Sequence, residues 1–132
     1  MSEPGMCYQL AATAVMDDLL DLVRETFDCP TDVRLVHGYP IGTGGDVEGV
    51  KYGHAWVECS AGGLTLVYDP SAEIVIPAFL YYDVGRIDPD ECQYYELDDI
   101  RQRVLVHEHW GPWDDVPENV AFSENISEFN PE

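Results

Sequence analysis

Three residues in the first half of the chain carry side chains suited to covalent catalysis: Cys7, His54 and Asp69. A cysteine thiol becomes an effective nucleophile when a helix N-terminus or a neighbouring imidazolium stabilises its thiolate. Cys7 opens a segment of helical periodicity and follows Gly5, which leaves the backbone free to turn sharply there. Such a nucleophile also needs a histidine that a third group holds in place, and His54 and Asp69 are the candidates.

A predicted β-hairpin brings His54 and Asp69 together. Two short apolar runs, residues 54–59 and 64–69, flank a Ser-Ala-Gly-Gly segment that is typical of a tight turn. If the turn is Ala-Gly, His54 lies directly opposite Asp69, with Cβ atoms about 4.5 to 5.5 Å apart. If the turn is Gly-Gly, Ser71 lies opposite His54 instead. The first register predicts a hydrogen-bonded His-Asp pair, and the second remains open.

The periodicity of the chain predicts an α+β fold, with one helix packed on an antiparallel sheet. From Cys7 to Phe27 the apolar residues recur at helical spacing, opposite a face of acidic side chains. Cys7 itself falls outside this apolar stripe, at its margin. The other predicted elements are strands at 33–39, 73–79 and 104–110, a helix at 97–104 and a glycine-rich loop at 40–53.

The chain is strongly acidic, because 26 Asp and Glu against 6 Lys and Arg give its 132 residues a formal net charge of -20. Binding to nucleic acid or to an anionic membrane needs a basic stripe, which so few cations cannot supply. The charge indicates a solvated surface, a basic partner, or mimicry of the phosphate field of DNA. The acids are concentrated after residue 83, and their field favours cationic or neutral substrates.

No apolar run approaches the roughly 18 residues of a membrane span, and the first residues lack a secretion signal, so we expect a cytoplasmic protein. The four cysteines lack the C-x-x-C spacing of a zinc ribbon or a redox pair and are expected to be free thiols. We predict no cofactor and no metal site. A single domain is expected over residues 1–110, followed by an acidic polar extension over 111–132.

Four segments carry a family resemblance: G-M-C-Y-Q-L-A at 5–11, V-R-L-V-H-G-Y at 33–39, G-H-A-W-V-E at 53–58 and V-Y-D-P-S at 67–71. In this order and spacing they resemble the transglutaminase-like core of the papain-like cysteine enzymes. In that superfamily Gly-x-Cys begins a helix, a strand ends in Gly-Tyr, His-Ala-Trp-x-Glu carries the histidine, and Asp-Pro-Ser or Asp-Pro-Thr carries the aspartate. The resemblance implies that Cys7 is the nucleophile, His54 the general base and acid, and Asp69 the orienting carboxylate.

Stabilisation of an oxyanion is where the chain departs from this pattern. Only six residues precede Cys7, so the upstream Gln or Trp that often serves such enzymes has no obvious counterpart. The backbone N–H of Cys7 is one expected donor. Gln9 and the backbone amide of Tyr8 are candidates for the second donor, and Trp56 for a contact with substrate or oxyanion.

Other chemical side chains have more ordinary interpretations. Trp56 and Glu58 share a strand face with His54 and are expected to support it, while His37 could approach the site from the neighbouring strand. A metal site built from His54 and the pair His107 and His109 with Glu108 would lack a further ligand placed by spacing. An aromatic group is expected to form core, or alternatively one wall of a substrate cleft: Tyr81, Tyr82, Tyr94, Tyr95, Trp110 and Trp113.

The sequence thus predicts a cysteine-dependent hydrolase or acyl transferase that acts on an amide bond, with a peptidase, amidase or deamidase favoured over cross-linking. Its substrate would be a peptide, a protein or a small amide, of cationic or neutral charge. Nucleic acid and membranes are not expected as partners. The alternative is a non-catalytic acidic protein, for instance a DNA mimic, that blocks a basic partner.

Overall fold

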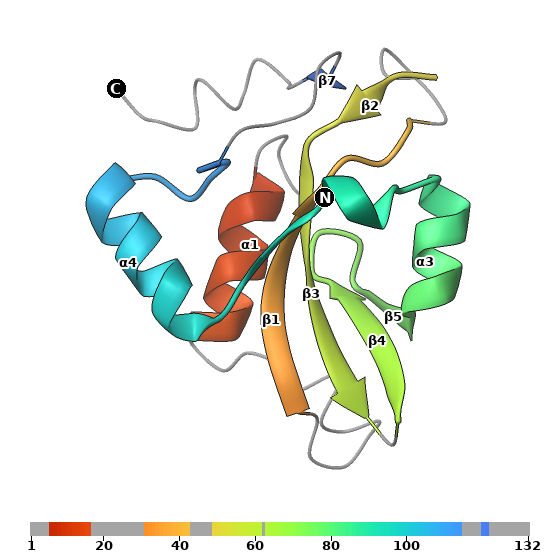
Figure 1. The fold of residues 1–132 in the computed structure, drawn as a ribbon, viewed down its shortest axis with the longest axis horizontal. Helices are drawn as coiled ribbons and strands as arrows, with labels where there is room; N and C mark the ends of the chain where they lie inside the picture. Colours follow the sequence, from red (N-terminus) through yellow and green to blue (C-terminus); the bar gives the residue numbers. More distant parts are fainter. Residues whose placement is uncertain (1–5, 17–30, 43–48, 62, 115–119, 122–132) are drawn as a thin grey trace.

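An antiparallel sheet of five strands forms the centre of the computed structural model, which describes residues 6–16, 31–42, 49–61, 63–114 and 120–121. The strands lie in the order β5 (Ile74–Pro77), β4 (Leu64–Asp69), β3 (His54–Ala61), β1 (Thr31–Gly38) and β6 (Gln93–Tyr95). Each strand is antiparallel to its neighbours. The α+β class that the sequence predicts is confirmed (Figure 1).

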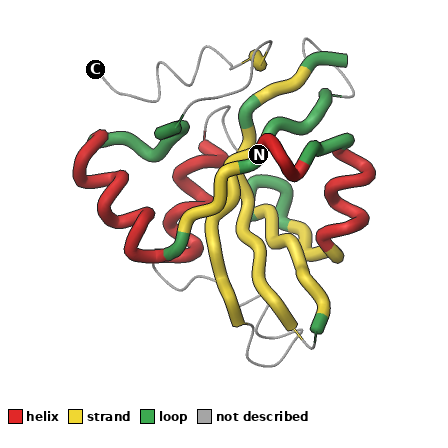
Figure 2. The backbone as a smooth tube through the Cα atoms, in the orientation of Figure 1, coloured by secondary structure: helices red, strands yellow, loops and turns green. Residues whose placement is uncertain are grey.

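Helices cover both faces of the sheet. On one face lie α1 (Met6–Met16) and α4 (Leu97–His107), and on the other lies α3 (Ala78–Gly85) (Figures 1 and 2). A short 3-10 helix, η2 (Pro89–Glu91), leads from α3 into the edge strand β6. The central strand β3 is therefore enclosed on both sides, which explains why consecutive residues Ala55, Trp56 and Val57 are all fully buried instead of alternating.

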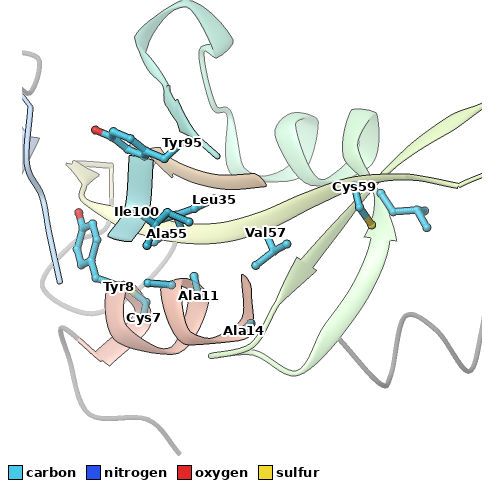
Figure 3. Close-up of a cluster of buried hydrophobic side chains, with 12 residues drawn as sticks. Cys7, Tyr8, Ala11, Ala14, Leu35, Ala55, Val57, Cys59, Tyr95 and Ile100 are labelled. Atoms are coloured by element: carbon cyan, nitrogen blue, oxygen red, sulfur yellow. The ribbon is translucent and has the colours of Figure 1, made fainter. Parts of the chain in front are cut away.

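Small side chains allow α1 to approach the sheet closely. Ala11, Ala12 and Ala14 of α1 belong to the same buried cluster as Ala55 and Val57 of β3 (Figure 3). A methyl group leaves the helix backbone near the strand, and it loses no rotamer entropy on burial. The N-terminal half of the helix is thus fixed on the strand that begins at His54.

Cys7 and Tyr8 also lie on the buried face of α1 (Figure 3). The expectation that Cys7 sits outside the apolar stripe is therefore wrong. One helical turn separates Cys7 from Ala11, so both residues lie on the same face of α1. The prediction failed because the apolar stripe was defined by large side chains further along the chain. Residues 17–27 of the predicted helix lie outside the described residues.

The β3–β4 hairpin has the second of the two registers considered from the sequence. Val57 pairs with Tyr68, Cys59 with Leu66 and Ala61 with Leu64. The turn is therefore the Gly-Gly one, and His54 is not directly opposite Asp69. A shift of two residues keeps every side chain on its original face of the sheet, so His54 and Asp69 still point to the same side.

Two predicted elements in the second half of the chain need correction. The strand expected at 73–79 ends at Pro77, which is the N-cap of a helix, α3, that the sequence analysis did not predict. The strand expected at 104–110 is wrong, because α4 continues to His107 and ends at Glu108 in a left-handed conformation. Pro77 is nevertheless the last residue of an edge strand, as expected for a residue without a backbone donor.

Packing continues beyond residue 110, where the sequence analysis placed a domain boundary. The Tyr95 hydroxyl donates a hydrogen bond of 2.6 Å to Asp114, and the ring centroid of Trp113 lies 5.1 Å from that of Tyr95. Further on, β7 (Val120–Ala121) pairs in parallel with β2 (Lys51–Tyr52). The first residues of the predicted extension are therefore part of the packed domain. Within the described residues, no helix is long and apolar enough to cross a membrane.

Candidate active site

The candidate nucleophile, Cys7, lies in the first turn of α1 and is 9% exposed. Backbone N–H groups in this turn have no acceptor within the helix, and the helix dipole places partial positive charge there. Both effects stabilise negative charge at the start of a helix. The His54 ring lies close enough to the Cys7 thiol for this group to help raise the pKa of His54.

His54 is the first residue of β3 and forms an ion pair with Asp69. Its Nε2 lies 2.9 Å from Oδ2 of Asp69, and the two side chains are 14% and 5% exposed. Since Nε2 is occupied by the carboxylate, Nδ1 is the ring nitrogen left to interact with Cys7. The imidazole therefore lies between a thiol and a carboxylate, which is the arrangement a cysteine nucleophile requires.

Asp69 is held by several donors in addition to His54. The backbone N–H and the hydroxyl of Ser71 donate to Oδ1, at 3.1 and 2.7 Å. The backbone N–H of Ala72 also approaches Oδ1, at 3.4 Å. The hydroxyl of Tyr81, from α3, donates to Oδ2 at 2.7 Å. Both carboxylate oxygens are thus satisfied, so the side chain is fixed in a single orientation.

These contacts determine the charges of the pair. Burial raises the pKa of Asp69, but hydrogen bonds from His54, Tyr81 and Ser71 outweigh it and lower the pKa to about 2. Burial lowers the pKa of His54, yet the hydrogen bonds with Asp69 and Cys7 and their negative charges raise it to about 10. At neutral pH the arrangement therefore favours an imidazolium paired with the Asp69 carboxylate.

Trp56 and Glu58 lie on the same face of β3 as His54, and Trp56 packs beside the imidazole. The indole N–H of Trp56 donates to Glu58 at 3.0 Å, and the centroid of an indole ring lies 6.0 Å from that of His54. Glu58 also accepts from the Tyr82 hydroxyl and pairs with Arg34 at 3.6 Å. Trp56 is fully buried with its N–H already engaged, so it has no free donor for substrate or oxyanion.

His37, Tyr8 and Gln9 occupy different places relative to the His54–Asp69 pair. His37 is fully buried on the opposite face of the sheet, where its ring contacts Tyr8, Tyr95 and Trp113, with centroids 4.8 to 5.0 Å apart. Burial lowers the pKa of His37 to about 3, so it stays neutral. The Tyr8 side chain belongs to this aromatic cluster, while its backbone N–H, the candidate donor, is in the first turn of α1. Gln9 is half-buried on α1.

Two tyrosines near the site were not identified as such from the sequence. Tyr81 was expected in the core or in one wall of a substrate cleft, and the position of α3 over β4 brings its hydroxyl to Asp69. Tyr52, in β2, has its ring centroid 6.0 Å from that of His54. No motif in the sequence marks either residue, because each reaches the site from an element outside the hairpin.

Metal ligands do not gather in the part of the chain that the structure describes: no three His, Cys, Asp or Glu side chains there are arranged to hold an ion. The rings of His107 and His109 lie 5.8 Å apart, on and after α4. Cys7, Cys59 and Cys92 are free thiols, and Cys29 lies outside the described residues.

Comparisons of the chain with protein-family models, with curated proteins and with solved structures gave no match. The geometry around Cys7, His54 and Asp69 is therefore the basis for a functional proposal.

Proposed function

We propose that the protein is a cysteine-dependent hydrolase or acyl transferase with a transglutaminase-like catalytic core. The proposal rests on one observation: the His54 ring joins the Asp69 carboxylate, at 2.9 Å, to the Cys7 thiol at the start of a helix. The order of these residues along the chain, and their positions on a helix and two strands, are those that the family resemblance implies. The substrate class is an amide or peptide.

In the first half of the reaction, the Cys7 thiolate attacks the carbonyl carbon of the amide, and the carbonyl electrons move to oxygen. The backbone N–H of Cys7 is available to stabilise the resulting oxyanion, because it lies in the first turn of α1. Collapse of this intermediate breaks the C–N bond. The His54 imidazolium donates its proton to the leaving nitrogen, which departs as an amine or ammonia.

In the second half, the acyl group is bound to Cys7 as a thioester and His54 is neutral. His54 accepts a proton from a water molecule as the water oxygen attacks the thioester carbonyl. Release of the carboxylic acid regenerates the Cys7 thiolate and the His54 imidazolium. An amine in place of water gives acyl transfer by the same steps, and we favour water as the acceptor.

Asp69 acts on the ring and not on the substrate. Its negative charge stabilises the imidazolium, and its two Ser71 contacts prevent it from rotating away. Without the Asp69 charge, or without the Ser71 contacts that orient the carboxylate, His54 is free to rotate. Both proton transfers then become less efficient.

Alkylation of Cys7 by iodoacetamide, followed by mass spectrometry over a range of pH, tests the activated thiol directly. In the parent protein we expect Cys7 to react below pH 7. In His54→Ala we expect a profile with the ordinary thiol pKa of about 8.5. Cys59 and Cys92 are internal controls, since burial raises the pKa of both thiols, that of Cys92 to about 12. Identical Cys7 profiles in the two proteins would contradict the proposal.

Turnover is tested with a library of peptide amides, comparing the parent with Cys7→Ala. We expect release of amine or ammonia that depends on Cys7. The alternative function, an acidic protein that blocks a basic partner, is favoured by the net charge of -20. This alternative requires salt-sensitive binding to a basic protein, and the binding must persist in Cys7→Ala. Comparison of the parent with Cys7→Ala therefore separates the two functions.

A further inference from the structure

An apolar cavity of about 300 Å³ lies directly beside the His54–Asp69 pair. It is formed where α3 crosses β4 and β5, and aliphatic side chains make up most of its wall. Its aliphatic lining includes Ala72, Ile74, Ile76, Leu80 and Val84. The volume is at the lower end of the range for ligand pockets, which suits one large apolar group and not an extended molecule.

The position of the cavity relative to the reacting groups decides what it can hold. His54 and Asp69 are part of its wall, whereas the described residues that line it do not include Cys7. The acyl group of a substrate must be next to Cys7, since it becomes bonded to sulfur. The leaving nitrogen must be next to His54, since it takes a proton from the imidazolium. A cavity on the His54 side therefore adjoins the leaving group.

We propose that this cavity binds an apolar group attached to the leaving nitrogen, so that the enzyme prefers amides of apolar amines or peptide bonds followed by an apolar residue. This inference rests on the proposed function and adds its substrate class. It gives the cavity a specific occupant, an aliphatic or aromatic group of side-chain size.

The accessibility of the cavity agrees with this occupant. Leu80 and Val84, one turn apart on α3, are 42% and 65% exposed, although they line the cavity. Ala72 is also exposed, on the turn after Asp69. Apolar side chains exposed at the mouth of a cavity lose contact with water when a ligand enters, which contributes to binding.

The charge of the cavity distinguishes it from the rest of this acidic protein. Among the described residues that line it, Asp69 is the one carboxylate and already pairs with His54, and the aliphatic side chains named above are uncharged. A cationic group would lose its hydration there without gaining an unpaired partner. The preference for cationic substrates expected from net charge therefore does not apply to this side of the scissile bond.

The test compares two amides of the same acyl group, an N-isopentyl amide and the primary amide, with the acyl group chosen from the library above. We expect kcat/KM to be at least about tenfold higher for the N-isopentyl amide, because a few buried methylenes give this much discrimination. The ratio of kcat/KM for the N-isopentyl amide to kcat/KM for the primary amide should fall by a similar factor in Leu80→Ser and in Ala72→Leu. The second of these substitutions fills the mouth of the cavity. Phe79→Ser is the matched control, since Phe79 is exposed on α3 outside the cavity.

A binding measurement separates failure of the cavity from failure of the catalytic proposal. N-isopentylacetamide is titrated into Cys7→Ala protein and followed by NMR, with the double variant Cys7→Ala, Ala72→Leu as comparison. Shifts confined to residues around the cavity, and lost on filling it, are expected. If Leu80→Ser and Ala72→Leu turn over both amides with the same ratio of kcat/KM as the parent, the cavity assignment is overturned but the proposed function is not. Binding without any Cys7-dependent turnover would contradict the proposed function and, with it, the leaving-group assignment.

Discussion

His54 and Asp69 form a hydrogen bond of 2.9 Å although they are not cross-strand partners. The ladder pairs Val57 with Tyr68, so that Trp56 comes opposite Asp69 and His54 is a diagonal neighbour. Diagonal positions are about 7 to 8 Å apart, which long side chains can span. The buried indole of Trp56 therefore lies next to both members of the pair. The orientation of His54 depends on this packing as well as on the carboxylate.

The first prediction concerns Asp69→Asn, which keeps the shape of the side chain and removes its charge. His54 must be protonated to protonate the leaving nitrogen, and its pKa is raised to about 10, so kcat/KM should fall only as the pH approaches 10. Loss of the carboxylate should move this alkaline limb down by about one to three pH units. The check is the pH profile of kcat/KM, with Asp83→Asn, an exposed carboxylate on α3, as control. Superimposable profiles for parent and Asp69→Asn would remove Asp69 from the mechanism.

A second prediction separates Tyr81 from its neighbour Tyr82. Tyr81→Phe removes a hydrogen bond to the Asp69 carboxylate, and Tyr82→Phe removes one to Glu58. Each should lower the free energy of unfolding by about 1.5 to 3 kcal/mol, because the acceptor is charged. Only Tyr81→Phe should also reduce kcat/KM, by several-fold, since it loosens the group that holds His54. Urea denaturation and kinetics on both variants are required, and equal activity losses would assign Tyr81 a structural role alone.

The proximity of His54 and Asp69 was predictable from the sequence even though the register of the hairpin was not. Moving the turn by one residue changes the pairing sum by two, and a two-residue shift preserves the face of each side chain. In either register, His54 and Asp69 therefore lie on the same face of the sheet. The reason for the observed register is visible only in the structure: Gly63 has a φ of +83°, a conformation that suits glycine in a tight hairpin turn.

The elements outside the hairpin were less accessible to prediction, for physical reasons. The run of aromatic and β-branched residues around Pro77 has strand propensity, and only packing on β4 and β5 stabilises the helix that follows it. The same packing positions Tyr81 and encloses the cavity beside Asp69. Contacts between segments far apart in the chain decide both features, and local periodicity does not report them.

Stability should depend on pH through the ion pair. The pKa of His54 is raised to about 10 from an unfolded value of about 6.5, so its contribution is complete below pH 6.5 and is lost as the pH rises through 10. The pKa of Asp69 is lowered to about 2, so its contribution is lost as the pH falls from about 4 to 2. Urea denaturation from pH 6 to 10 should show a steeper decline for the parent than for His54→Gln. Parallel curves would mean that His54 does not gain its charge on folding.

The final prediction concerns Gly38, which pairs with His54 across β1 and β3. A Cβ atom at this position would lie 2.3 Å from Cη2 of Trp56 and 3.0 Å from Sγ of Cys92. Gly38→Ala must therefore displace the indole, at a cost typical of overpacking, about 1 to 3 kcal/mol in the free energy of unfolding. Because the indole packs beside His54, kcat/KM should fall more than the loss of folded protein explains. Thr65→Ala, an exposed position on β4, is the control for sheet substitutions. A fully active and fully stable Gly38→Ala protein would show that the close approach of Gly38 to Trp56 does not position His54.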